Sequence, residues 1–282
     1  LLCGAALMWH MSMFDPQILA QNVINGADSF PLLAVPFFML AGEVMNAGGL
    51  SRRIVNFALA LVGHIKGGLG YVAIVAAVMM AALSGSAVAD AAALTALLLP
   101  MMVAAGHDKG RSAGLLASAS IIAPIIPPSS GFVIFGVAAN VSISKLFMAG
   151  IAPGIMLAAA LWATWWWVAR KEQVAVPPRK SRAEVWTAFK DATFALVMPV
   201  IVVVGLKFGV FTPTEAAVVA AVYAIVISTL VYRELKFSDL YGLFLAASKT
   251  TAVIMFLVAA AMVSAWLITV AQLPAEVVKL LQ

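Results

Sequence analysis

The sequence is poor in charged residues and almost free of cysteine. Only 10% of its 282 residues are charged and 64% are hydrophobic, with a mean hydropathy of +1.06. A soluble domain needs more polar surface, so this composition predicts a multi-pass membrane protein. The single cysteine, Cys3, excludes a disulfide framework and is expected to pack in an apolar segment. The apolar runs lack strict alternation, which favours helices over a β-barrel.

Motifs for catalysis and for nucleic-acid binding are also missing. The chain has no G-x-S-x-G nucleophile motif and no HExxH zinc motif. Its histidines fall at the ends of predicted membrane spans: His10, His64 and His107. The Lys and Arg residues flank apolar runs and form no single basic patch, so nucleic acid is not expected as a partner. We predict neither an enzyme nor a resident cofactor.

The long apolar runs predict a series of membrane helices. Residues 1–11 have the composition of the end of one helix, and residues 14–30 that of a polar connection. Residues 51–66 and 233–249 carry apolar side chains at helical spacing beside polar ones, which predicts amphipathic helices at the membrane surface. A basic loop is expected over 170–190. Further spans are predicted over 31–46, 142–170, 192–210, 211–232 and 250–270.

A helical hairpin is predicted over residues 67–106, whose middle reads Ser84-Gly85-Ser86-Ala87. The flanking helices would have about 16 and 14 residues, and at 1.5 Å per residue they reach roughly 24 and 21 Å. A hydrocarbon core is about 30 Å thick, so we favour a re-entrant hairpin whose tip stops inside the membrane. Two short full spans remain the alternative, since predicted boundaries carry errors of a few residues.

The next run, residues 112–140, is uncharged and contains a proline cluster that predicts a broken helix. Proline lacks a backbone N–H and crowds the carbonyl four residues earlier. Three carbonyls are therefore expected to lose their helical partners: those of Ser120, Ala123 and Pro124. In lipid such groups need other partners, so either neighbouring protein covers the break or the break lines a polar cavity.

A hairpin tip that faces a broken helix would form a site near the middle of the membrane. Helix N-termini attract a carboxylate, and freed carbonyls and hydroxyls offer oxygen ligands to Na⁺. The predicted ion- and substrate-binding residues are Ser84, Gly85, Ser86 and Asp90 on one wall, and Pro124, Pro127, Pro128, Ser129, Ser130 and Gly131 on the other. The candidate Na⁺ ligands are Ser84, Ser86 and Ser129. The alternative is purely structural, a kinked helix beside a packing turn of small residues.

Three acidic residues have competing interpretations. Asp90 is the one charge in residues 67–106, and an intramembrane acid suggests a functional site, although a helix cap is the alternative. Glu43 is expected in a helix–helix contact, because Gly42 and Asn46 lie nearby. Glu215 follows Thr-Pro-Thr and is expected to cap a helix.

Basic residues and a weak repeat set the predicted topology. With residues 170–190 in the cytoplasm, the cations of 52–66, 107–111 and 233–236 also fall inside, as the positive-inside rule requires. Residues 50–56 (LSRRIVN) and 273–279 (LPAEVVK) share an apolar frame but exchange charges, and their spans run in opposite directions. This pattern is typical of an inverted repeat. It predicts a second hairpin and a second broken helix beyond the chain, which is expected to be incomplete at both ends and inactive alone.

Several segments resemble the large membrane subunit of TRAP transporters, the DctM-like tripartite ATP-independent periplasmic transporters. They are AVPFFMLAGEVMNAGGL, GHIKGGLGYVAIV, AALSGSAVADAAAL, PIIPPSSGFVIFGV, VSISKLFMAGIAPG and GVFTPTEAA. The family's Ser-Gly-Ser-Ser tip corresponds to Ser84-Gly85-Ser86-Ala87, so the last hydroxyl is missing. Asp90 stands where the family has a small or hydroxylated residue. The family's Pro-Pro-Ser break matches Pro127-Pro128-Ser129.

The resemblance implies a function and partners. Such proteins sit in the bacterial inner membrane and import organic acids, such as C4-dicarboxylates or sugar acids, with Na⁺ as the coupling ion. A small four-helix membrane subunit accompanies the large one, and a periplasmic solute-binding protein delivers the substrate. The sequence segments HDKGRSAG and FGVAANVS favour a branch of the family that transports sugar acids. The alternatives are a stand-alone Na⁺/carboxylate symporter and a membrane scaffold that transports nothing.

The resemblance also implies an inverted-repeat, elevator-type ion transporter fold, which divides the chain into four parts. Residues 1–66 hold scaffold helices and an interfacial arm helix, and residues 67–141 hold the hairpin and broken helix of a transport domain. Residues 142–190 form a linking helix with a basic cytoplasmic loop. Residues 191–282 begin the second repeat with further scaffold helices.

Overall fold

The computed structural model describes residues 5–6, 8–9, 15–171, 174, 176–272 and 279. Within these ranges every regular element is a helix, and six segments are long and apolar enough to cross a membrane. The prediction of an all-α multi-pass membrane protein is therefore confirmed. The predictions for Cys3, for His10 and for most of the second repeat copy (273–278) fall outside the described residues.

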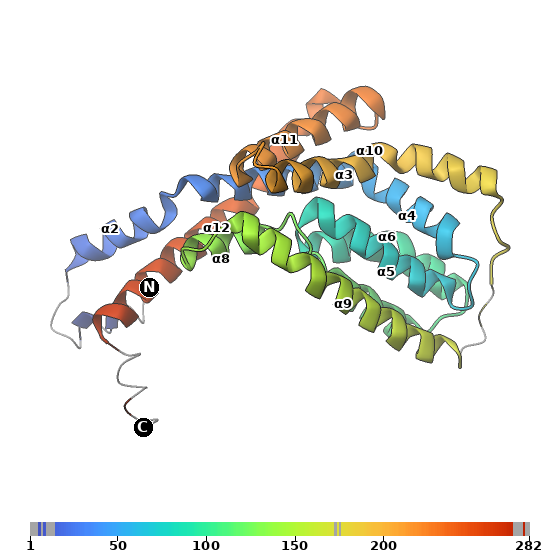
Figure 1. Cartoon of the computed structure of the whole chain (residues 1–282), viewed down its shortest axis with the longest axis horizontal. Coiled ribbons are helices and arrows are strands. Elements are labelled where there is room, and N and C mark those ends of the chain that lie inside the picture. Colours follow the sequence, from blue (N-terminus) through green and yellow to red (C-terminus); the bar gives the residue numbers. More distant parts are fainter. Residues whose placement is uncertain are drawn as a thin grey trace.

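The helices appear in chain order in Figure 1. They are α2 (Pro16–Ala27), the 3-10 helix η1 (Phe30–Leu33), α3 (Ala34–Ala47), α4 (Leu50–Val62), α5 (Gly68–Ser84), α6 (Ala87–Ala104), α7 (Lys109–Ser120), α8 (Ser130–Ala138), α9 (Ile143–Ala169), α10 (Arg182–Lys207), α11 (Pro213–Val226), the π-helical turn η2 (Ile227–Val231) and α12 (Phe237–Val270).

Helix α3 lies inside the main body, packed against α11, α12, α5 and α8. Helix α11 contributes a buried face of alanines: Ala216, Ala217, Ala220, Ala221 and Ala224. Their spacing places them on one side of the helix. Such small side chains let neighbouring helices approach closely, which is how membrane helices gain packing contacts without a hydrophobic driving force.

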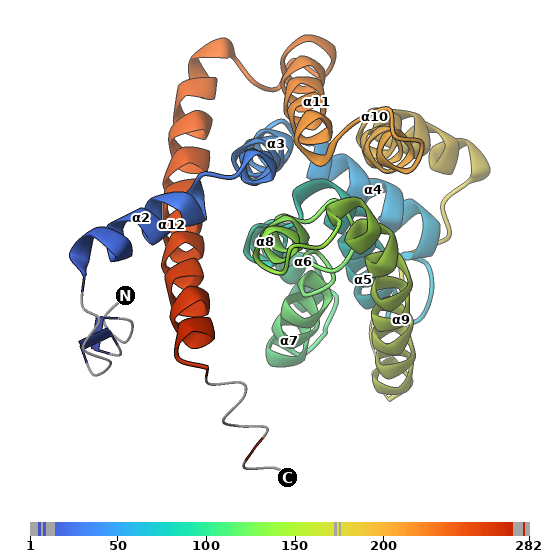
Figure 2. The ribbon, with the colours of Figure 1, turned by 60° about the vertical axis from the view of Figure 1, so that its left-hand side comes forward.

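Helices α2 and α12 form an arm that projects from this body. The two lie side by side toward the lower left of Figure 1, and Figure 2 shows α12 as one long helix crossed by α2. A Cβ atom added to Gly26 of α2 would lie 2.8 Å from the Cβ of Met262 in α12. The missing side chain at Gly26 therefore permits the close crossing.

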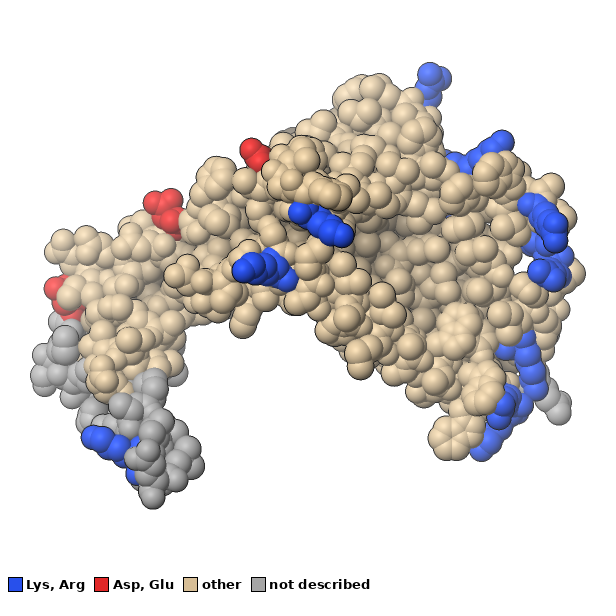
Figure 3. Space-filling view, in the orientation of Figure 1, with Lys and Arg blue, Asp and Glu red and all other residues tan. Residues whose placement is uncertain are grey.

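Three connections meet at one end of α9. Trp165 donates its indole N–H to the Gly67 carbonyl at 2.9 Å, and Lys66 Nζ donates to the Arg170 carbonyl at 3.0 Å. The ring of His107 lies 5.6 Å from that of Trp165. Lys and Arg gather at this end, on the right of Figure 3. These connections are the ones predicted to be cytoplasmic.

The connections predicted to be external meet at the opposite end of α9. They line one cavity of about 470 Å³, with contributions from residues 29–31, 140–144 and 212–214. Thr214 also donates its hydroxyl hydrogen to the Phe30 carbonyl at 3.3 Å. The two groups of connections thus lie at opposite ends of the body, which is the separation that the predicted orientation requires.

Several predicted boundaries are wrong. Residues 14–30 form no simple polar connection, because Asp15 caps α2 by accepting the Gln17 N–H at 2.8 Å and Pro16 begins the helix. Residues 233–249 and 250–270 are not two elements, since α12 runs unbroken for 34 residues from Phe237. The predicted basic loop is shorter than expected, since a capping box between Ser181 and Glu184 starts α10 within it. The amphipathic segment 51–66 contains most of α4, whose buried face packs on α10 and α5, and its place at the membrane surface stays a prediction.

The hairpin helices are longer than predicted. Helix α5 has 17 residues and α6 has 18, against the expected lengths of about 16 and 14. At 1.5 Å per residue they span roughly 26 and 27 Å, close to the thickness of a hydrocarbon core. Length therefore no longer separates a re-entrant hairpin from two short spans, and the re-entrant geometry stays a prediction.

Candidate ion and substrate site

The hairpin tip is shaped by Ser84, Gly85 and Ser86. Gly85 ends α5 with φ of +58°, a left-handed conformation that glycine adopts without a steric penalty. Ser86 begins α6 by accepting the Ala89 N–H on its hydroxyl oxygen, and its own N–H donates to Ser84 Oγ at 3.2 Å. The Ser-Gly-Ser sequence thus ends one helix and starts the next within a single turn.

Asp90 lies completely buried beside this tip. Ser84 donates its hydroxyl hydrogen to Asp90 Oδ1 at 2.5 Å, whereas Asp90 Oδ2 has no hydrogen-bond partner among the described residues. The cap of α6 is Ser86, so the alternative of a capping role for Asp90 is wrong. A buried carboxylate with a free oxygen is costly unless a donor or a cation satisfies it.

The proline cluster breaks the helix as predicted, with α7 ending at Ser120 and α8 starting at Ser130. The peptide bond between Pro127 and Pro128 is cis. The carbonyls of Ser120 and Pro124 lose the helical N–H four residues on, as predicted, because residues 124 and 128 are prolines, and other donors replace it. Ser120 O accepts the Ala123 N–H at 3.1 Å, and Pro124 O accepts the Ser129 hydroxyl at 2.8 Å.

Protein covers the break on two sides. A Cβ atom on Gly85 would lie 2.7 Å from Pro128 O and 3.1 Å from Ser129 Cα, so the hairpin tip touches the break through backbone atoms. On another side, Gly150 of α9 is so close to Ile125 O that a side chain at that position would clash. The two predicted walls therefore meet directly, and of the two possibilities for the break the structure shows the covered one.

The adjoining cavity opens on the other side of the tip. It has a volume of about 590 Å³ and lies between α3, α6 and the start of α4, with Ser84 and Ser86 in its wall. None of residues 124–131 lines it. The predicted site residues therefore divide: Ser84 and Ser86 reach the cavity, Gly85 and Asp90 lie beside it, and Pro124, Pro127, Pro128, Ser129, Ser130 and Gly131 lie behind the tip.

Helix α3 supplies residues that the sequence interpretation did not assign to the site. A Cβ atom on Gly42 would lie 3.4 Å from Ser84 Cα, so α3 touches the tip there. Glu43 and Asn46 line the cavity, and Glu43 makes no ion pair within the described residues. The helix–helix contact expected at this point of α3 is made by Gly42, whereas Glu43 lines the cavity. Glu43 and Asn46 are three residues apart and so lie on one side of an otherwise apolar helix, and this spacing could have indicated a polar lining.

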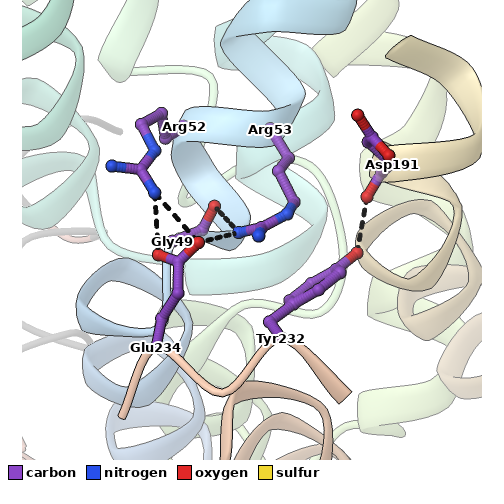
Figure 4. A network of polar contacts seen from close by, with 6 residues as sticks. All are labelled: Gly49, Arg52, Arg53, Asp191, Tyr232 and Glu234. Atoms are coloured by element: carbon purple, nitrogen blue, oxygen red, sulfur yellow. Dashed lines mark hydrogen bonds and ion pairs between the residues drawn. The ribbon is translucent and has the colours of Figure 1, made fainter. Parts of the chain in front are cut away.

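Two adjacent arginines meet one carboxylate at the cavity edge. Arg52 Nη2 lies 2.9 Å from both oxygens of Glu234, and Arg53 Nη1 lies 2.6 Å from Oε1 (Figure 4). Arg53 also donates to the Gly49 carbonyl at 3.1 Å. Gly49 has φ of +75°, and any side chain there would collide with the Glu234 carboxylate. The cluster thus joins the α3–α4 turn to the segment before α12.

Tyr232 holds Arg53 from the other side. The Arg53 guanidinium lies 3.7 Å from the centre of the Tyr232 ring, and the Tyr232 hydroxyl donates to the Asp191 carbonyl of α10 at 2.6 Å (Figure 4). Burial raises the pKa of Tyr232 to about 12, so its hydroxyl stays a hydrogen-bond donor at neutral pH. Helices α4 and α10 and the segment between η2 and α12 are therefore held together at one point.

Comparison of the sequence with known proteins identifies its family. The whole chain, residues 1–282, matches the family described as "Tripartite ATP-independent periplasmic transporter, DctM component". It is 58% identical over its full length to the 2,3-diketo-L-gulonate TRAP transporter large permease protein YiaN of Escherichia coli and spans 66% of that protein.

More distant relatives carry the same designation. The chain is 41% identical over 255 residues to the sialic acid TRAP transporter large permease protein SiaM of Vibrio cholerae, a match that covers 90% of the chain and 60% of SiaM. It is 37% identical over 276 residues to the C4-dicarboxylate TRAP transporter large permease protein DctM of Pseudomonas aeruginosa, covering 98% of the chain and 65% of that protein. The predicted location in the bacterial inner membrane is confirmed. The chain belongs to the DctM family of TRAP transporter large permeases.

Proposed function

We propose that this chain is part of the large permease subunit of a Na⁺-coupled, binding-protein-dependent importer of organic acids. One structural observation carries the proposal: the backbone contact between Gly85 at the hairpin tip and Pro128 at the helix break. It brings together two helix N-termini, those of α6 and α8, with buried hydroxyl and carboxylate oxygens. Helix N-termini favour anions, and oxygen clusters favour hard cations.

Each part of the tip has a role in this proposal. The free Asp90 Oδ2 and the hydroxyls of Ser84, Ser86 and Ser129 are the oxygens on this chain that would hold Na⁺. The adjoining cavity of about 590 Å³ falls within the usual size range of small-molecule sites. The substrate class is supported by relatives whose printed substrates, diketogulonate, sialic acid and C4-dicarboxylates, are all carboxylic acids.

Elevator-type alternating access is the mechanism that fits this packing best. The tip and the break touch through backbone atoms with no side chain between them, so they would move together as one rigid unit. Helix α3 borders that unit along α5 and α8, and its Gly42 touches Ser84 of the tip. The part that moves would carry α5 to α8, and α3 with α11 would stay in place.

Reconstitution of the full-length permease tests the proposal. It would be placed in liposomes with its small membrane subunit, and uptake of a labelled organic acid would be followed with and without the periplasmic binding protein. We expect uptake only with an inward Na⁺ gradient and only with the binding protein present. Na⁺-driven uptake without the binding protein would instead indicate a stand-alone symporter. No uptake under any gradient, from a correctly folded complex, would favour a scaffold without transport activity.

A further inference from the structure

The cavity beside the hairpin tip has an uneven distribution of charge. Its polar lining comes from α3, the start of α4, the tip, and residues near and in α12: Glu43, Asn46, Ser51, Arg52, Ser84, Ser86, Glu234 and Thr250. One cation, Arg52, thus faces two carboxylates, Glu43 and Glu234. The two carboxylates differ in their partners, because Glu234 is paired with arginines and Glu43 has no ion pair within the described part of the chain.

Arg52 is the cation available to a ligand. Its side chain is 58% exposed, and ion pairs of that exposure contribute little to stability. The Arg53 side chain is 20% exposed and is held by Glu234, the Gly49 carbonyl and the Tyr232 ring. If Arg52 turned toward a ligand, Arg53 would still neutralise Glu234. Figure 4 shows the two arginines reaching Glu234 from opposite sides. Arg52 can therefore exchange Glu234 for a ligand carboxylate at low cost.

Glu43 and Asn46 of α3 form a second part of the polar lining. They lie three residues apart on α3, and Asn46 Oδ1 already accepts the Ser51 hydroxyl. An unpaired carboxylate is a strong acceptor for ligand hydroxyls. The same carboxylate repels a second negative charge on a ligand, and such repulsion is one way in which binding sites reject a close analogue. Hydroxyl groups are thus favoured near Glu43, and a second carboxylate is disfavoured.

We propose that Arg52 and Glu43 are specificity-determining residues that select a polyhydroxy monocarboxylate over the corresponding dicarboxylate. Arg52 binds the carboxylate, and Glu43 with Asn46 binds hydroxyls toward the other end of the ligand. This inference rests on the organic-acid transport proposed above and adds a substrate preference located in the permease itself. It assigns a role to α3 and α4, outside the hairpin and the break.

Three ligands that differ only at their ends test this preference. Gluconate carries one carboxylate, glucarate carries two, and sorbitol carries none on the same hydroxylated six-carbon chain. The purified full-length permease with its small subunit would be titrated with each ligand in Na⁺, and affinity would be taken from ligand-dependent thermal stabilisation. We expect the order gluconate, then glucarate, with sorbitol not bound.

Three substitutions separate the role of Arg52 in carboxylate binding from the role of Glu43 in rejecting a second carboxylate. Arg52→Gln should weaken gluconate binding by about tenfold or more, the effect of losing a charged hydrogen bond. Glu43→Gln should improve glucarate binding by about tenfold relative to gluconate, because the repulsion is removed. Lys180→Gln is the matched control, since it removes a cation from the wall of a different cavity. Should Arg52→Gln fail to fold, Arg52→Lys keeps the charge and Glu43→Gln still carries the test.

The outcomes distinguish the two proposals. An unchanged gluconate-to-glucarate ratio in Glu43→Gln, or an equal loss in Lys180→Gln and Arg52→Gln, would overturn the preference assigned to this cavity while Na⁺-driven uptake persisted. Loss of all Na⁺-driven organic-acid uptake by the wild-type complex would instead overturn the proposed function. A tighter binding of glucarate than of gluconate by the wild-type protein would also contradict the preference.

Discussion

Ser129 donates its hydroxyl hydrogen to the carbonyl oxygen of Pro124 at 2.8 Å. In a continuous helix this carbonyl would accept the N–H of residue 128, but residue 128 is a proline and has none. The side chain next to the proline supplies the missing donor. One hydroxyl therefore replaces one of the N–H donors that the prolines remove from the helix.

Removing that hydroxyl should destabilise the protein. Ser129→Ala leaves the carbonyl of the half-buried Pro124 without its donor, which should lower the free energy of unfolding by about 1 kcal/mol. Ser120→Ala is a matched control, because Ser120, like Ser129, is buried and donates to a backbone carbonyl at 2.8 Å, that of Leu116. Leu116 lies within α7 and its carbonyl keeps a helical partner. Thermal unfolding in detergent should separate the two variants, and equal melting temperatures would contradict the account.

The contact between the tip and the break predicts a large effect of Gly85→Ala. A methyl group there meets both an unfavourable φ and the Pro128 carbonyl at 2.7 Å. We expect a loss of about 2–4 kcal/mol, from backbone strain of about 1 kcal/mol or more together with overpacking. Gly209→Ala isolates the strain, since Gly209 has φ of +70° and no neighbouring atom within 4 Å.

A second control involves neither backbone strain nor overpacking. Gly114 lies in α7 with open space around it and no positive φ, so Gly114→Ala should be neutral or stabilising by about 0.5–1 kcal/mol. The predicted order of melting temperatures is Gly114→Ala highest, Gly209→Ala next and Gly85→Ala lowest. If Gly85→Ala behaved like Gly209→Ala, the tip would not press on the break.

The free oxygen of Asp90 predicts stabilisation by sodium. Replacing choline with Na⁺ should raise the melting temperature of the full-length protein, because a cation satisfies the buried Oδ2. Asp90→Asn should reduce this rise, since the amide carries no charge. Asp28→Asn, which changes an exposed carboxylate at the end of α2, should leave it unchanged. Equal stabilisation of the wild type and Asp90→Asn would exclude Asp90 as a sodium ligand.

The alanine face of α11 predicts a position-dependent effect of size. Ala220→Leu places a larger side chain at a fully buried position and should cost about 1–3 kcal/mol through overpacking. Val222→Leu enlarges a side chain on the same helix that is 55% exposed, so it should change stability little. Yield of the folded protein and its melting temperature provide the measurement. Similar losses in both variants would contradict tight packing of the alanine face as the cause.

The local features of the site followed from the sequence because they depend on residue chemistry alone. The turn at Gly85 and the break at Pro124–Pro128 need no distant partner, since glycine and proline impose them. The start of α11 was predicted for the same reason, as Thr212 and Glu215 form a complete capping box. The hydrophobic composition likewise predicted helices that cross a membrane.

Features that depend on tertiary contacts were missed. Glu234 is distant in sequence from Arg52 and Arg53, and no periodicity connects them. The position of the cavity depends on where α3 passes the hairpin, which the approach of Gly42 to Ser84 decides. Helix α2 was mistaken for a polar connection because its stability comes from packing against α12.

We assign the coupling ion to the hairpin tip and the break, beside the cavity proposed for the substrate. The most direct test of this assignment is the Na⁺ dependence of organic-acid uptake by the reconstituted full-length complex carrying Ser86→Ala or Ser129→Ala. Ser238→Ala, an exposed hydroxyl at the start of α12, serves as the control. We predict that each tip or break variant inserts normally but needs more Na⁺ for half-maximal uptake, while Ser238→Ala matches the wild type. Wild-type uptake and Na⁺ dependence in both Ser86→Ala and Ser129→Ala would contradict the assignment.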